Sequence, residues 1–154
     1  MARINDFRAQ THHHHLPTGS IRMDNLEYHP GFESVSQLEM PVINQGYLSR
    51  KYCFVYELIG GEYRMTDVRI VKKDLCNRGR DRMWSKDNHF SSEPRFFPKP
   101  GSLDEDDGVL FTNVLDGQTG RSYLLILDGQ TLDEINTGYR PTWIPYTLHG
   151  RFFE

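Results

Sequence analysis

The amino-acid sequence predicts an all-β protein, in which antiparallel strands follow one another along the chain as meanders. Its clearest segment is a pair of apolar runs, "GVLFTNVL" and "SYLLILD", on either side of the glycine-bearing turn "DGQTG". A second pair, "KYCFVYEL" and "EYRMTDVRIV", flanks Gly60 and Gly61. The chain holds no convincing amphipathic helix of three turns. Consecutive antiparallel strands of this kind form a propeller blade or part of a barrel.

The N-terminal half divides into a polar segment and the first strand pair. Residues 1–30 combine histidines, other polar residues and turn formers without a sustained period, which predicts a loosely ordered segment before a β domain over residues 31–154. Strands are expected at 51–58 and 62–71, joined as a hairpin. The charged stretch 72–82 is expected to be a loop.

The second half predicts a connection followed by a further meander. The prolines and the acidic run of "SSEPRFFPKPGSLDEDDG" predict an exposed connection with one short strand. Strands at 108–115 and 122–128, joined at Asp116–Gly120, should be antiparallel neighbours, and their nearly continuous apolar character predicts burial on both faces. A turn at "DGQT" leads to a weak strand near 138–141, and "YTLHGRFF" is expected to be the last strand.

Composition is that of an ordinary water-soluble domain. The chain has 154 residues, of which 37% are apolar and 25% charged, enough for one domain with a sizeable core. The net charge of −3, with both signs mixed, provides no basic surface for nucleic acid. No apolar run reaches the ~18 residues of a membrane helix. The start, "MARINDFRAQ", lacks the apolar core of a signal peptide.

The two cysteines bear on the cellular compartment. Cys53 and Cys76 lie 23 residues apart, and Cys53 falls inside an apolar strand pattern. This pattern favours free thiols in a reducing compartment over a structural disulfide. A cytoplasmic location is therefore expected.

Five segments together resemble a known protein family. In order along the chain they are "LEMPVIN", "RKYCFVY", "SSEPRFFPKPG", "EDDGVLFTNVLDGQTGRSYLLILDGQTL" and "IPYTLHGRFF". In this order and spacing they resemble the C-terminal part of the carotenoid cleavage oxygenases, a family that includes stilbene-cleaving oxygenases and a retinoid isomerase. The resemblance runs from Leu38 to Phe153. It implies the last two to three blades of a seven-bladed β-propeller.

The resemblance also implies a metal site. In the family, iron(II) on the propeller axis is held by four histidines from separate blades, and glutamates hydrogen-bond three of these histidines. His149, in the "HG" pair near the end of the chain, matches the last iron ligand. Glu39 in "EMPVIN" and Glu93 in "SEP" match two of the glutamates. Nothing in the chain matches the other three histidines or the first glutamate.

These residue types suit iron chemistry, although each has an ordinary alternative. Neutral imidazole suits Fe(II), and a carboxylate that accepts its second N–H orients the ring. Without the resemblance, His149 would be a core or surface histidine, and Glu39 and Glu93 would be solvated charges. His12 to His15 match no family ligand, and neighbouring side chains of an extended chain point to opposite sides. They are interpreted as a flexible polar tract that could bind Ni(II) or Zn(II) adventitiously.

Two functions follow. The resemblance implies an iron(II) dioxygenase that uses O2 to cleave a conjugated C=C bond of a carotenoid, apocarotenoid or stilbene. The lipophilic substrate implies peripheral contact with a membrane. Since His149 is one of four expected ligands, the isolated chain is expected to be inactive. The alternative is a non-catalytic truncated product that binds a lipophile or a protein partner. Whether adjoining genomic sequence encodes the three missing histidines discriminates between them.

Overall fold

The computed structural model describes residues 11–15, 20–24, 35–61, 64–77 and 80–139, and the single positions 141, 144 and 149. Within these ranges the regular structure is β, apart from one short 3-10 helix, η1 (Gln45–Tyr47). The prediction of an all-β fold is confirmed. No helix in the described part of the chain has the length and apolar character needed to cross a membrane.

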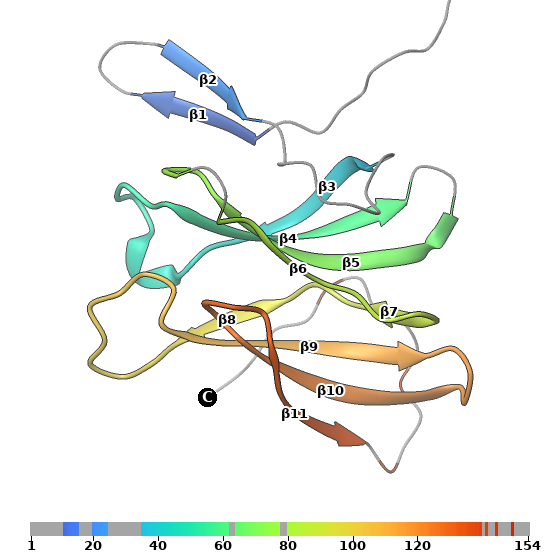
Figure 1. Cartoon of the computed structure of the whole chain (residues 1–154). Helices are drawn as coiled ribbons and strands as arrows, with labels where there is room; N and C mark the ends of the chain where they lie inside the picture. The colour runs from blue at the N-terminus through green and yellow to red at the C-terminus, as the bar shows by residue number, and fades with distance from the viewer. Residues whose placement is uncertain are drawn as a thin grey trace, which may run out of the picture.

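The first large sheet has four antiparallel strands in the order β3-β4-β5-β6 (Figure 1). They are β3 (Val35–Val42), β4 (Phe54–Gly61), β5 (Arg64–Asp74) and β6 (Arg82–Trp84). The β4–β5 hairpin confirms the predicted pair. The prediction of a loop over residues 72–82 is wrong for its first residues, because β5 continues to Asp74. Lys72, Lys73 and Asp74 are buried, so their charge did not signal exposure.

The second large sheet has the strand order β11-β10-β9-β7, and β8 also pairs with β9. Its strands are β7 (His89–Ser91), β8 (Arg95–Pro98), β9 (Gly108–Asp116), β10 (Arg121–Asp128) and β11 (Glu134–Tyr139). The predicted antiparallel pairing around the Asp116–Gly120 turn is confirmed. The expected exposed connection before β9 is wrong in part, since Ser91, Ser92 and Phe96 are buried.

The core lies between the two large sheets. Tyr56, Leu58 and Ile70 of one sheet pack in a single cluster with Leu110 and Leu125 of the other. Burying each such side chain contributes roughly 1.5–3 kcal/mol. Burial along β9 alternates, with one face buried and the other half-buried, so the expected burial on both faces is wrong. The apolar run was long enough for either arrangement, and only the inner face meets the opposing sheet.

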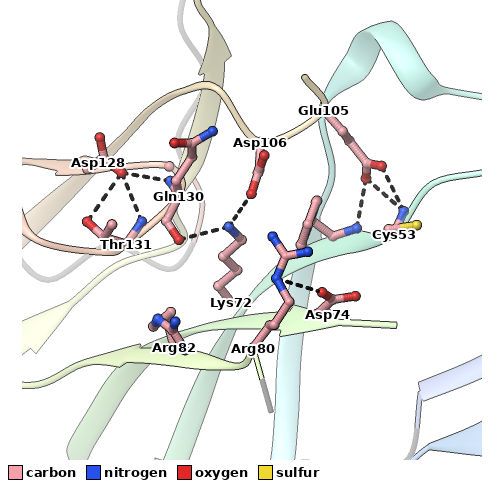
Figure 2. Close-up of polar contacts among 12 residues, drawn as sticks. Cys53, Lys72, Asp74, Arg80, Arg82, Glu105, Asp106, Asp128, Gln130 and Thr131 are labelled. Atoms are coloured by element: carbon pink, nitrogen blue, oxygen red, sulfur yellow. Dashed lines mark hydrogen bonds and ion pairs between the residues drawn. The ribbon is translucent and has the colours of Figure 1, made fainter. Parts of the chain in front are cut away.

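A group of polar contacts, built around the buried Lys72–Asp106 pair, joins the two sheets beside this core (Figure 2). We call it the inter-sheet clasp, formed by Lys72, Glu105, Asp106 and Gln130. The Lys72 Nζ on β5 lies 2.5 Å from the Asp106 Oδ2 and donates to the Gln130 carbonyl at 2.9 Å. The Lys72 side chain is only 3% exposed. Burial lowers the pKa of Lys72, and the hydrogen bond to Asp106 opposes that effect.

Glu105 completes the clasp at the start of β4. Its carboxylate accepts hydrogen bonds from the backbone N–H groups of Cys53, at 2.9 Å, and Phe54, at 2.7 Å. The Asn44 amide donates to the Glu105 carbonyl at 2.8 Å. At the other end of the same acidic run, a Cβ on Gly108 would lie 2.3 Å from the Phe97 carbonyl oxygen. The "EDDG" motif is therefore a structural element that joins the sheets.

The cysteines form a disulfide, contrary to the expected free thiols. The Cys53 and Cys76 sulfur atoms are bonded and join the segment before β4 to the segment after β5. The two segments are adjacent because Leu75 N–H donates to the Cys53 carbonyl at 2.7 Å. This adjacency depends on strand pairing, which the cysteine spacing alone does not reveal. The expected cytoplasmic location loses the support of free thiols and stays a prediction.

The histidine tract lies in a strand. β1 (Thr11–His15) pairs antiparallel with β2 (Ser20–Asp24) as a hairpin. The loosely ordered segment expected over residues 1–30 stays a prediction. The domain division near residue 30 is not tested by this pairing and stays a prediction. The expected terminal strand "YTLHGRFF" lies outside the described residues except for His149.

Replacing Asp106 with alanine should destabilise the protein strongly. The change leaves the Lys72 ammonium buried without its counter-charge, which typically costs about 3–5 kcal/mol. The double variant Lys72→Met/Asp106→Leu should recover most of this loss, because it removes both charges. Urea unfolding measures each variant. Asp107→Ala is the control, since Asp107 pairs with the exposed Lys99; a loss as large as that of Asp106→Ala would contradict the role given to the clasp.

Reducing the disulfide should lower stability by about 3 kcal/mol, the loop-closure effect for a separation of 23 residues. Urea unfolding with and without a dithiol measures the difference. The double variant Cys53→Ser/Cys76→Ser should have the lower stability and no response to dithiol. Two free thiols titrated in the untreated, oxidised protein would show that the bond does not form.

Stability should fall with rising pH because of Glu57 on β4. Burial, with a smaller contribution from Asp81, raises its pKa from 4.5 to about 7, while Lys73 opposes the shift. The folded state therefore binds this proton more tightly, and the associated stability is complete below 4.5 and is lost as pH rises through about 7. Glu57→Gln should remove about 3 kcal/mol of pH dependence in unfolding experiments. Asp133→Asn, at an exposed carboxylate, should keep the wild-type profile.

Candidate metal centre

Glu93 lies in a short segment between β7 and β8 whose backbone is held against β9. Ser92 N–H donates to the Asn113 carbonyl at 2.8 Å, and the Thr112 hydroxyl donates to the Ser92 carbonyl at 2.7 Å. Pro94 follows and is fully buried. A residue before proline is biased toward extended backbone. The Glu93 carboxylate therefore comes from an anchored, extended segment, and its side chain is 9% exposed.

The C-terminal segment reaches the same sheet at two described positions. The Ser122 hydroxyl on β10 donates to the Ile144 carbonyl at 2.7 Å. Five residues further along, the His149 Nδ1 lies 3.3 Å from the Glu93 Oε2. The His149 side chain is 73% exposed. The fold thus brings together His149 and Glu93, which are 56 positions apart in the sequence.

One carboxylate oxygen connects three side chains. The Glu93 Oε2 that meets the His149 Nδ1 also accepts a hydrogen bond from the Arg95 Nη2 at 2.9 Å. When His149 is neutral and its proton is on Nδ1, the ring donates to Glu93 and its Nε2 carries a lone pair. That lone pair is the donor that a metal ion requires. In that tautomer, the Nε2 of His149 is the ring nitrogen with a lone pair for coordination.

Glu39 lies in the other sheet, on β3, and is exposed. The pairing of β3 with β4 shifts register between Glu39 and Val42, and Met40 has a φ of +55°, so Glu39 begins a β-bulge. Bulges redirect side chains and are frequent next to active sites. The structure thus brings Glu93 and His149 together and places Glu39 on a separate sheet. Its assignment as a partner of an iron ligand stays a prediction.

The remaining described histidines belong to other environments. His12 to His15 occupy β1. His89 lies at the start of β7, where its Nδ1 is 2.7 Å from the Asp87 carbonyl and its ring packs edge-on against Tyr123. Among the described residues, no group of three or more His, Cys, Asp or Glu side chains is arranged to hold a metal ion. The contact between the His149 imidazole and the Glu93 carboxylate pairs two of the predicted site residues. Their assignment to an iron site stays a prediction.

Residues 5–154 match the family described as retinal pigment epithelial membrane protein. The chain belongs to this family. Among curated relatives, a carotenoid dioxygenase of Neurospora crassa is 41% identical over 113 residues, which are 73% of this chain and 18% of the relative. Carotenoid cleavage dioxygenase 8 of Arabidopsis thaliana is 32% identical, over 97% of this chain and 25% of its own length. The resemblance found in the sequence motifs is confirmed.

Solved structures of this family share the fold. A variant of the Synechocystis apocarotenoid oxygenase matches with a TM-score of 0.68 and 30% identity, over 88% of this chain and 28% of that protein. The cobalt-substituted form of the same oxygenase matches with a TM-score of 0.67 and 30% identity, over 87% of this chain and 27% of that protein. The chain thus spans about a quarter or less of the length of the curated relatives named above.

Proposed function

We propose that this chain is the C-terminal portion of a non-haem iron(II) dioxygenase that cleaves a conjugated carbon–carbon double bond of a carotenoid or apocarotenoid, with O2 as cosubstrate. Stilbenes are a further substrate class with the same kind of bond. Membership of the family and the names of the relatives support the reaction class. The contact between His149 and Glu93 is the observation that supports the proposal at the level of individual residues.

Each residue would have a defined role. His149 would occupy one coordination position through Nε2, and Glu93 would accept the Nδ1 proton and hold the ring in that orientation. Bound iron supplies the activation of dioxygen. Glu39, at the bulge of β3, is proposed as the partner of another histidine ligand. The cobalt-substituted form of the similar Synechocystis oxygenase supports a metal-containing site in the family.

The proposal also covers membrane contact, cellular location and the activity of the isolated chain. A lipophilic polyene would reach the site from a membrane surface, so peripheral membrane contact and a cytoplasmic location belong to the same proposal. The inactivity of the isolated chain, expected from the sequence, also stays part of it. A non-catalytic product that binds a lipophile or a protein is the competing function.

A chimera tests the proposal. Residues 35–154 would replace the matching segment of the Synechocystis apocarotenoid oxygenase. This design leaves out the histidine tract His12 to His15, so that it cannot contribute to the measured metal content. The chimera should bind iron and cleave an apocarotenoid, measured by metal analysis and by chromatography of the aldehyde products. His149→Ala should lose both properties, and Glu93→Gln should lower iron affinity or activity by roughly 10–100-fold.

Lys99→Ala provides the matched control, because the ion pair of Lys99 with Asp107 is exposed. It should leave iron content and cleavage unchanged. A folded chimera that keeps its iron and its activity after His149→Ala would show that His149 is not a ligand. A folded chimera without iron or activity would favour the non-catalytic function.

A further inference from the structure

We propose that Arg95 is a positioning residue for His149, acting through the Glu93 carboxylate. The inference rests on the proposed function, in which His149 must present its Nε2 lone pair to a metal ion. It assigns to Arg95 the task of holding Glu93 in the one orientation that accepts the Nδ1 proton.

Arg95 contacts the same Glu93 oxygen atom that lies next to His149. Glu93 and Arg95 are two residues apart, on either side of the buried Pro94, and alternate residues of an extended chain point to the same side. The Arg95 Nη2 is 2.9 Å from the Glu93 Oε2, the same oxygen that lies 3.3 Å from the His149 Nδ1. A carboxylate oxygen has two lone pairs, so it can accept both hydrogen bonds at once.

Exposure decides which partner orders the carboxylate. The His149 side chain is 73% exposed, and an exposed ring is free to move, whereas the Glu93 side chain is 9% exposed. The Arg95 side chain is 38% exposed and makes the shorter contact. A glutamate side chain loses considerable rotamer freedom when it is fixed, and a charge-assisted hydrogen bond offsets part of that loss. Arg95 therefore orders Glu93, and the ordered carboxylate then orients His149.

Arg95 has a second effect on the Glu93 Oε2, which weakens the hydrogen bond to His149 where the first effect favours it. Its positive charge makes Glu93 a weaker acceptor for the imidazole proton than an isolated carboxylate would be. This effect is small here, because solvent screens a partly exposed guanidinium. The same charge balances Glu93, so that the buried carboxylate has a counter-ion when the neighbouring ring is neutral. We expect the ordering effect to dominate.

The tautomer of His149 reports this effect without a metal ion. In the ¹⁵N-labelled chain at about pH 8, above the ordinary histidine pKa and with a chelator present, imidazole nitrogen shifts measure the ratio of Nδ1–H to Nε2–H forms. His149→Gln identifies the signal. The wild-type chain should favour Nδ1–H. Arg95→Met should lower the ratio by about twofold, the low end of what one hydrogen bond supplies, and Arg95→Lys should restore part of it.

Lys99→Met is the matched control, because it removes one positive charge from an exposed ion pair beyond the end of β8. It should leave the ratio unchanged, which separates an effect of position from an effect of net charge. Backbone amide spectra verify that each variant is folded. If Arg95→Met does not fold, Arg95→Gln makes the same comparison.

The outcomes separate this inference from the proposed function. If Glu93→Gln lowers the ratio but Arg95→Met and Arg95→Gln do not, Glu93 orients His149 unaided, and only the role of Arg95 is overturned. If Glu93→Gln also leaves the ratio unchanged, the contact with His149 does not orient the ring. In that case the inference falls, and so does the role given to Glu93 in the proposed function.

Discussion

The buried ion pair between Lys72 and Asp106 is the interaction on which the rest of the structure depends. It joins β5 of the four-stranded sheet to the loop before β9 of the five-stranded sheet. Glu39 belongs to the first sheet, whereas Glu93 and the contact with His149 belong to the second. In the proposed function both glutamates serve one metal centre, which requires that the sheets carrying them be fixed relative to each other. The clasp supplies a directional constraint that an apolar interface alone lacks.

Energetics explain why a polar clasp specifies this arrangement. Moving a lysine and an aspartate out of water costs several kcal/mol per ion, and their attraction offsets that cost only in good geometry. Sliding one sheet over the other would preserve much of the contact between leucines, but it would separate Lys72 from Asp106 and from the Gln130 carbonyl. The hydrogen bond from the Tyr56 hydroxyl to the Gly129 carbonyl, at 2.8 Å, adds the same kind of restriction. The ion pair therefore does more to fix the relative position of the two sheets than to raise the stability of the fold.

The sequence predicts those parts of the fold that are determined locally. The turns after β9 and β10 share the letters "DGQT", and in each the aspartate side chain accepts hydrogen bonds from the N–H groups two and three residues later. Such turns are visible in a single sequence because every participant is close by. The end of β5 is different. Lys72 and Asp106 are 34 residues apart, so "KKD" looks like a loop until its partner is known. The Cys53–Cys76 pair was misjudged for the same reason.

The candidate metal centre shows the same difference between local and long-range features. Composition and periodicity do not connect Glu93 with His149, and only the resemblance to a family did so. Arg95 was not singled out, although its signal was present: an acidic and a basic residue two positions apart on an extended segment face the same side. Pro94 between them lacks an N–H and favours that extended backbone, which explains why Arg95 can reach the Glu93 carboxylate oxygen. The "SEP" motif thus does more than supply a glutamate. Its proline sets the backbone that lets the next residue fix the glutamate, and the fixed glutamate leaves the Nε2 of an exposed histidine as the atom available to a metal ion.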